Sequence, residues 1–112
     1  MARSAAAAKL VARAPVFAAL GDETRLGLVV RLSAQGPLST VALTEGSKVT
    51  RQAITKHLRV LSEAGLVKGT REGRDSIWEL SPDRLDDVRR CLEAISGQWD
   101  AALGRLRDFV ER

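Results

Sequence analysis

The stretch from Ser47 to Ser62 carries four lysine and arginine side chains and no acidic one. Ordinary surface helices mix both charge signs, whereas a surface that meets nucleic-acid phosphates has a local excess of positive charge. The net charge of the chain, +4, permits a polyanionic partner but does not require one. The local arrangement therefore says more than the total. It predicts contact with a nucleic acid through Lys48, Arg51, Lys56 and Arg59.

A helix over residues 50–64 would display these side chains on one face. Its inward positions, Ile54, Leu58 and Leu61, have the i, i+4, i+7 spacing of a buried stripe. In helix-turn-helix proteins the N-terminal residues of the recognition helix read bases in the major groove, and Arg and Gln can each make two bonds to one base. We expect Arg51, Gln52, Thr55 and Lys56 to read bases, and Lys48, Thr50, Lys56 and Arg59 to contact the backbone. The alternative is an ordinary solvated helix face.

His57 lies at the edge of the apolar stripe of this helix, and two interpretations stay open. Its imidazole could bond a DNA phosphate, so it is included among the candidate DNA-binding residues. Equally, it could be a half-buried side chain with a partner in the protein. Metal ligation by a single histidine is not expected.

A short hairpin follows, with strands expected over 66–71 and 76–80 around a glycine-containing turn at 72–75. Arginines beside such a turn are well placed to clamp a phosphate or enter a minor groove. Arg71 and Arg74 are the candidates here. Glu72 and Asp75 dilute the positive field of the hairpin.

The remaining elements complete a mainly α-helical chain with one small β-hairpin. Helices are expected over 4–13, over 16–20 after Pro15, from an Asp22 N-cap to about Ala34, and over 39–45. Gly65 should end the 50–64 helix, and Ser81-Pro82 should start the last one. We predict a single winged helix-turn-helix domain over 1–112, with the helix-turn-helix at 39–64 and the wing at 66–80.

The last helix, 82–111, contains an unbroken heptad stripe. A domain of this size has little need of so long a stripe for its own core, so we expect at least its second half to pair with another chain. The alternative is that the helix lies across its own domain. The stripe consists of Leu85, Val88, Leu92, Ile95, Trp99, Ala102, Leu106 and Phe109.

Composition excludes several function classes. One cysteine, one histidine and no tyrosine argue against a disulfide framework, a metal site and a stacking platform for single-stranded nucleic acid. No catalytic dyad or phosphate-binding glycine loop is present, so neither an enzyme nor a cofactor is expected. Lys9 and Arg13 interrupt the alanine-rich start, which indicates a cytoplasmic protein rather than a secreted or membrane one. Cys91 is interpreted as an inert buried residue, with a redox switch as the alternative.

Three segments of the chain resemble the ArsR/SmtB family of winged-helix repressors. They read LGDETRLGLVVRL, TRQAITKHLRVLSEAGLV and GTREGRDSIWEL, and the resemblance covers roughly residues 14–81. The tail ISGQWDAALGRLRDFVE looks like that of a subgroup often encoded beside START-like ligand-binding proteins. The resemblance implies repression at an operator near the protein's own promoter. It also implies a homodimer built by the first and last helices, with Leu10, Leu92, Ile95, Trp99, Ala102, Leu106 and Phe109 at the interface.

Two segments depart from the metal sensors of that family. The segment STVALTEG lacks the cysteines that bind metal before the recognition helix, and SPDRLDDVRRCLEAI has carboxylates but no histidine. Metal sensing is therefore not carried over, and a small molecule or a protein remains as the possible effector. A winged-helix module that binds a protein instead of DNA is the alternative function.

Overall fold

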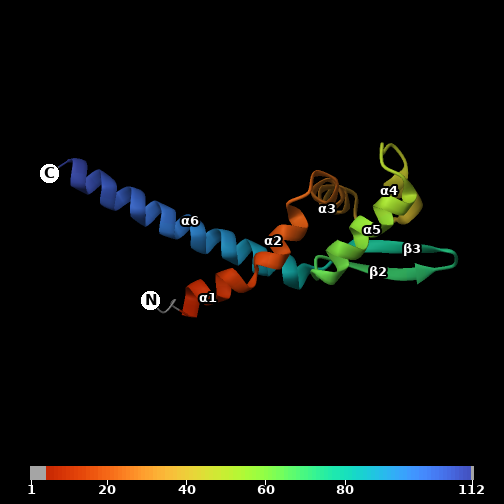
Figure 1. Ribbon diagram of the computed structural model, residues 1–112, viewed down its shortest axis with the longest axis horizontal. Helices are drawn as coiled ribbons and strands as arrows, with labels where there is room; N and C mark the ends of the chain where they lie inside the picture. The colour runs from red at the N-terminus through yellow and green to blue at the C-terminus, as the bar shows by residue number, and fades with distance from the viewer. Residues whose placement is uncertain (1–4, 112) are drawn as a thin grey trace.

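The computed structural model describes residues 5–111, which form six helices and three short strands (Figure 1). This order confirms the predicted winged helix-turn-helix, with α4 and α5 as the helix-turn-helix and β2–β3 as the wing. No helix in these residues is long and apolar enough to cross a membrane. The elements are α1 (Ala5–Ala12), α2 (Ala14–Leu20), α3 (Glu23–Gln35), β1 (Leu38–Ser39), α4 (Thr40–Thr44), α5 (Arg51–Glu63), β2 (Val67–Glu72), β3 (Asp75–Leu80) and α6 (Pro82–Val110).

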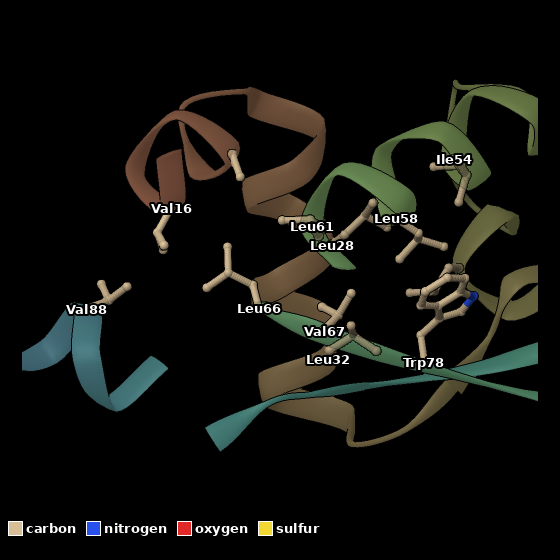
Figure 2. Close-up of a cluster of buried hydrophobic side chains, with 12 residues drawn as sticks. Val16, Leu28, Leu32, Ile54, Leu58, Leu61, Leu66, Val67, Trp78 and Val88 are labelled. Atoms are coloured by element: carbon tan, nitrogen blue, oxygen red, sulfur yellow. The ribbon is translucent and has the colours of Figure 1, made fainter. Parts of the chain in front are cut away.

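One hydrophobic core connects these elements (Figure 2). Its centre is the predicted inward stripe of α5, where Ile54, Leu58 and Leu61 are at most 1% exposed. α5 packs against α2, α3, α4 and β2 of the wing through this stripe, so it turns its opposite face to solvent. The buried members are Val16, Ala19, Leu28, Leu32, Leu43, Ile54, Leu58, Leu61, Leu66, Val67, Trp78 and Val88.

The sheet has a third strand that the sequence did not reveal. β1 pairs antiparallel with β3, which lies between β1 and β2. Leu38 lies opposite Trp78 on β3, and the Trp78 Nε1 donates a hydrogen bond of 2.9 Å to the Thr40 hydroxyl at the start of α4. The wing is thereby joined to β1 and to the start of α4.

The helix boundaries follow local capping chemistry. Asp22, Ser39 and Thr50 each accept a hydrogen bond from the backbone N–H three residues on, at 3.0, 3.0 and 3.2 Å respectively. Gly65, with φ +79°, ends α5, and the Leu66 N–H reaches back to the Leu61 carbonyl as expected for a Schellman motif. Ser81 occupies the N-cap position of α6, but its side chain makes no capping bond.

The turn of the wing is tighter than predicted, because β2 ends one residue later and β3 begins one residue earlier than expected. Glu72 and Asp75 already pair across the two strands, so the loop contains only Gly73 and Arg74. Gly73 has φ +62°, whereas no residue other than glycine in the described chain has a positive φ. This combination fits a type II′ hairpin turn, which needs glycine at its first central position.

The last helix leaves the body of the molecule and carries most of its predicted stripe into solvent (Figure 1). Val88 belongs to the core and Leu85 packs against it, whereas Leu92, Trp99 and Phe109 are 53%, 66% and 72% exposed. The alternative of a helix lying across its own domain is therefore wrong. Ile95 and Leu106 are exposed too, and Ala102 is half-buried.

The packing of Gly69 against Trp78 gives a stability prediction. A Cβ at Gly69 would lie 2.7 Å from the Trp78 ring, which is itself buried and paired to β1. Gly69→Ala should therefore lower the free energy of unfolding by about 1–3 kcal/mol, as overpacking does. Urea unfolding at one fixed protein concentration measures this change.

Gly27→Ala is the matched control, because Gly27 lies inside α3 with no atom within 4 Å of an added Cβ. It should raise the stability by up to about 1 kcal/mol through helix propensity. A Gly69→Ala protein as stable as the parent would contradict the packing of the indole against β2.

Candidate nucleic-acid interface

The outward face of α5 brings the predicted base-reading residues together. Arg51, Gln52 and Lys56 are exposed, and Thr55 is half-buried between them. With Arg59 they border one open hollow on the surface of the helix. Each of these positions is held outward because the opposite stripe of α5 is locked in the core. The face therefore presents cationic and amide donors along the first two turns of the helix.

Two hydroxyls on this helix differ in what they can still offer. The Thr50 hydroxyl accepts a hydrogen bond from the Ala53 N–H, so its own proton stays available for an outside acceptor such as a phosphate. The Thr55 hydroxyl donates to the Arg51 carbonyl at 2.9 Å. Its proton is used, so Thr55 can only accept from a ligand in this arrangement.

Arginines on α3 hold the fold together and do not belong to this surface. The Arg25 Nε donates to the Ala19 carbonyl at the end of α2, at 2.6 Å. Arg31 donates to the Leu43 and Ala42 carbonyls of α4, at 3.1 and 3.2 Å. Both guanidinium groups thus satisfy carbonyls near helix C-termini, which the helix dipole also favours.

Arginines in the first turns of α6, and Arg13 between α1 and α2, have acidic partners. Arg13 and Arg84 pair with Asp87 at 3.2 and 3.3 Å. Arg89 and Arg90 pair with Asp86 at 2.7 and 3.0 Å, which lowers the pKa of the Asp86 carboxyl. By contrast, among residues 5–111 no ion pair or side-chain hydrogen bond holds Lys48, Lys56, Arg59, Lys68 or Arg74. Most of the described cations without an internal partner therefore lie on the helix-turn-helix and the wing. The others are Lys9 on α1 and Arg105 and Arg107 near the end of α6.

On the wing, the two predicted arginines have different surroundings. Arg71 is exposed, and its Nε donates to the Gly73 carbonyl at 3.1 Å, which braces the turn. Arg74 is exposed at the tip itself. Both stand on the end of the hairpin that points away from the core (Figure 1).

His57 points toward the protein and not toward the cationic face. Its Nδ1 lies 3.3 Å from an Arg25 nitrogen and 3.7 Å from an Asp22 carboxylate oxygen, and its side chain is 24% exposed. A hydrogen bond from the Arg25 N–H is the largest cause that lowers the pKa of Asp22, and the nearby Arg25 and His57 charges act in the same direction. The geometry therefore matches the half-buried alternative for His57 and joins α5 to the N-terminus of α3.

Sequence reasoning missed the role of Asp75, which it had treated as a diluting surface charge. The carboxylate accepts from the Ser76 N–H at 2.7 Å and from the Val41 N–H of α4 at 3.2 Å. Its Oδ1 also lies 3.6 Å from an Arg51 nitrogen at the start of α5. Three elements, β3, α4 and α5, therefore meet at one carboxylate, a contact that no sequence pattern encodes.

The pKa of Asp75 reflects these contacts. Partial burial raises it, but the hydrogen bonds from Ser76, Thr40 and Val41 and the charge of Arg51 lower it, and the net pKa lies below the ordinary aspartate value. Asp75 is therefore ionised at neutral pH.

Leu10 and Cys91 lie at a second surface, an open hollow between α1 and α6. Leu10 is half-buried there, and the Cys91 thiol is buried, with 8% exposure for the residue. Within residues 5–111, no group of three or more His, Cys, Asp or Glu side chains could hold a metal ion.

Comparisons with known proteins agree with this geometry. Residues 20–70 match a family model described as a helix-turn-helix domain. The chain is 38% identical over 93 residues to an HTH-type transcriptional regulator of Mycobacterium tuberculosis, with 83% of each protein covered. It is 37% identical to the arsenical resistance operon repressor of Escherichia coli, covering 68% of this chain and 71% of that protein. A solved ArsR-like transcriptional regulator from Rhodococcus is similar over 91% of this chain and 92% of its own, with a TM-score of 0.71 and 36% identity.

The position of His57 gives a prediction that separates it from its neighbour Lys56. His57→Ala should lower the free energy of unfolding by about 1 kcal/mol, because the contacts to α3 are lost. The salt dependence of binding to duplex DNA should stay as in the parent, because no phosphate contact is removed. Urea unfolding and fluorescence anisotropy across a salt series give the two values. A reduced salt dependence without loss of stability would instead identify His57 as a phosphate contact.

Proposed function

Because the chain belongs to the ArsR family of winged helix-turn-helix transcriptional regulators, we propose that it represses transcription as a homodimer bound to a palindromic operator in double-stranded DNA. The observation that carries the proposal is the outward face of α5 from Arg51 to Arg59, which holds no acidic residue and whose cations mostly lack partners inside the protein. Lys56 and Arg59 can bind phosphates without breaking an ion pair inside the protein, so this face is compatible with a phosphate surface.

In this proposal the N-terminal half of α5 enters the major groove. Arg51 and Gln52 supply directional donors to base edges, with Thr55 and Lys56 behind them. Lys48, Thr50, Lys56 and Arg59 contact phosphates and fix the register of the helix. Arg74, at the tip of the wing, reaches the flanking minor groove or backbone, and Arg71 supports the turn that presents it.

The dimer is proposed to form through α1 and α6. Support comes from the stripe of exposed apolar side chains on α6. Removing this stripe from water in a dimer would gain free energy roughly in proportion to the apolar area buried. A two-fold axis through such a seam makes the two copies of α5 read half-sites about one helical turn apart. The interface residues proposed are Leu10, Leu92, Ile95, Trp99, Ala102, Leu106 and Phe109.

The effector is proposed to be a small molecule or a protein and not a metal. Arsenical resistance appears in the names of relatives, but soft metal ions prefer several thiolates and this chain has one cysteine. The proposal accordingly contains no metal-dependent step and no redox role for the buried Cys91.

Two substitutions on α5 should distinguish a residue that reads bases from a residue that contacts phosphates. Gln52→Ala should reduce the difference in binding free energy between the preferred and the scrambled duplex by about 1–3 kcal/mol, because a directional base contact is lost. Lys56→Ala should weaken binding to all duplexes and reduce the slope of log K against log salt by about one. Fluorescence anisotropy on DNA from upstream of the protein's own gene, and on the same DNA scrambled, measures both effects.

Unchanged binding of every duplex by both variants would show that this face of α5 does not meet DNA. Weak, equal binding of both duplexes by the parent protein, with little salt dependence, would favour a winged helix that binds a protein partner.

A substitution that introduces a charge on the α6 stripe tests whether the dimer forms through this stripe. Trp99 is 66% exposed in the single chain, so Trp99→Asp should leave the fold intact while it makes burial of the stripe costly. Sedimentation velocity should then find monomers where the parent protein sediments as a dimer. Ala101→Asp, an exposed neighbour off the heptad stripe, is the control and should remain dimeric. A dimer that persists with Trp99→Asp would contradict the proposed seam.

A further inference from the structure

We propose that Asp75 determines sequence specificity by positioning the Arg51 guanidinium for a base edge and keeping it from neighbouring phosphates. This inference rests on the proposed binding of DNA through α5. Asp75 would touch no base in this role and would act through Arg51 alone.

The first step is that the Asp75 carboxylate is fixed. Its two oxygens accept from separate backbone amides, Ser76 on its own strand and Val41 in the first turn of α4. Asp75 also starts β3, directly beside the tight turn of the wing. Its side chain is only 23% exposed, so few other rotamers are open to it.

The second step is that this fixed charge faces the first residue of α5. The Arg51 nitrogen lies 3.6 Å from Asp75 Oδ1, while the Arg51 side chain remains 54% exposed. The guanidinium is thus oriented at one edge and still has donors to offer at another. A planar guanidinium has five N–H donors, so it can keep one carboxylate contact while it binds a base at two points.

The third step is the sign of the local field. A carboxylate on a surface that meets DNA repels phosphates and so lowers the affinity for DNA. Its presence there is explained if it raises sequence specificity instead. Next to Arg51 it offsets part of the non-specific attraction of that arginine and limits its rotamers. Affinity for arbitrary DNA decreases, and discrimination in favour of a matching base increases.

The experiment compares Asp75→Asn with Glu72→Gln. Glu72 lies directly across the hairpin from Asp75 and is exposed, and within residues 5–111 its side chain has no ion pair or hydrogen bond. Each variant removes one negative charge from the same end of the wing. The probes are a duplex selected from a random-sequence pool by the parent protein and a scrambled version of that duplex. The measured quantity is the discrimination ratio, which is the dissociation constant for the scrambled duplex divided by that for the selected duplex.

Both variants should bind the scrambled duplex more tightly than the parent protein does. Only Asp75→Asn should also reduce the ratio, by about tenfold, as expected for a loosened arginine–base contact. In an Arg51→Ala background the effect of Asp75→Asn on the ratio should disappear, which a purely structural role would not produce. Equal ratios for Asp75→Asn and Glu72→Gln would overturn the inference.

Asp75→Asn also alters the contact to α4, so Asp75→Glu is the second variant. It keeps the charge but moves the carboxylate, and it should reduce the ratio without changing the salt dependence; an unchanged ratio would overturn the inference. If the parent protein and Arg51→Ala discriminate equally, the proposed base-reading face fails together with it. If Arg51→Ala loses discrimination while both Asp75 variants keep it, only the role of Asp75 is wrong.

Discussion

The buried indole of Trp78 is the contact on which the DNA-facing side depends. It lies on the middle strand of the sheet, opposite Leu38 of β1 and against Gly69 of β2, and it donates its single N–H to Thr40 of α4. The same ring joins the core that holds α5 (Figure 2). Strand, wing and helix-turn-helix therefore share one large rigid side chain. Nearer the tip of the wing, Asp75 on the same strand lies 3.6 Å from Arg51 at the start of α5.

The charges of the protein divide into an internal and an external set. Arg25 and Arg31 satisfy carbonyls of α2 and α4, and the arginines at the start of α6 pair with Asp86 and Asp87. The ion pairs carry no net positive charge, and the guanidinium groups of Arg25 and Arg31 are directed at carbonyls of the protein. The cations of α5 and the wing form the external set. A winged helix with a modest net charge can in this way present a basic surface on its helix-turn-helix and wing.

The sequence was sufficient wherever structure follows from local chemistry. Caps at Asp22 and Thr50, the stop at Gly65 and the inward stripe of α5 depend on residues a few positions apart, so their patterns could be recognised. β1 could not be foreseen, because two residues carry no alternation and its pairing depends on the distant β3. Asp75 and His57 were misjudged or left open for the same reason. Their partners, Val41 and Asp22, lie 34 and 35 residues away, and only the assembled fold brings them together.

The length of α6 has a mechanical consequence. Its first turns are embedded in the core through Val88, while its remaining turns stand outside the body that carries α5. A helix of 29 residues spans about 43 Å at 1.5 Å per residue, so it behaves as a stiff lever. If the distal stripe is held by a second chain, a tilt of about 10° there displaces the near end by about 8 Å, which is nearly a quarter of a DNA turn. A small tilt between the distal halves of the two α6 helices would therefore move both copies of α5 out of register with their major grooves.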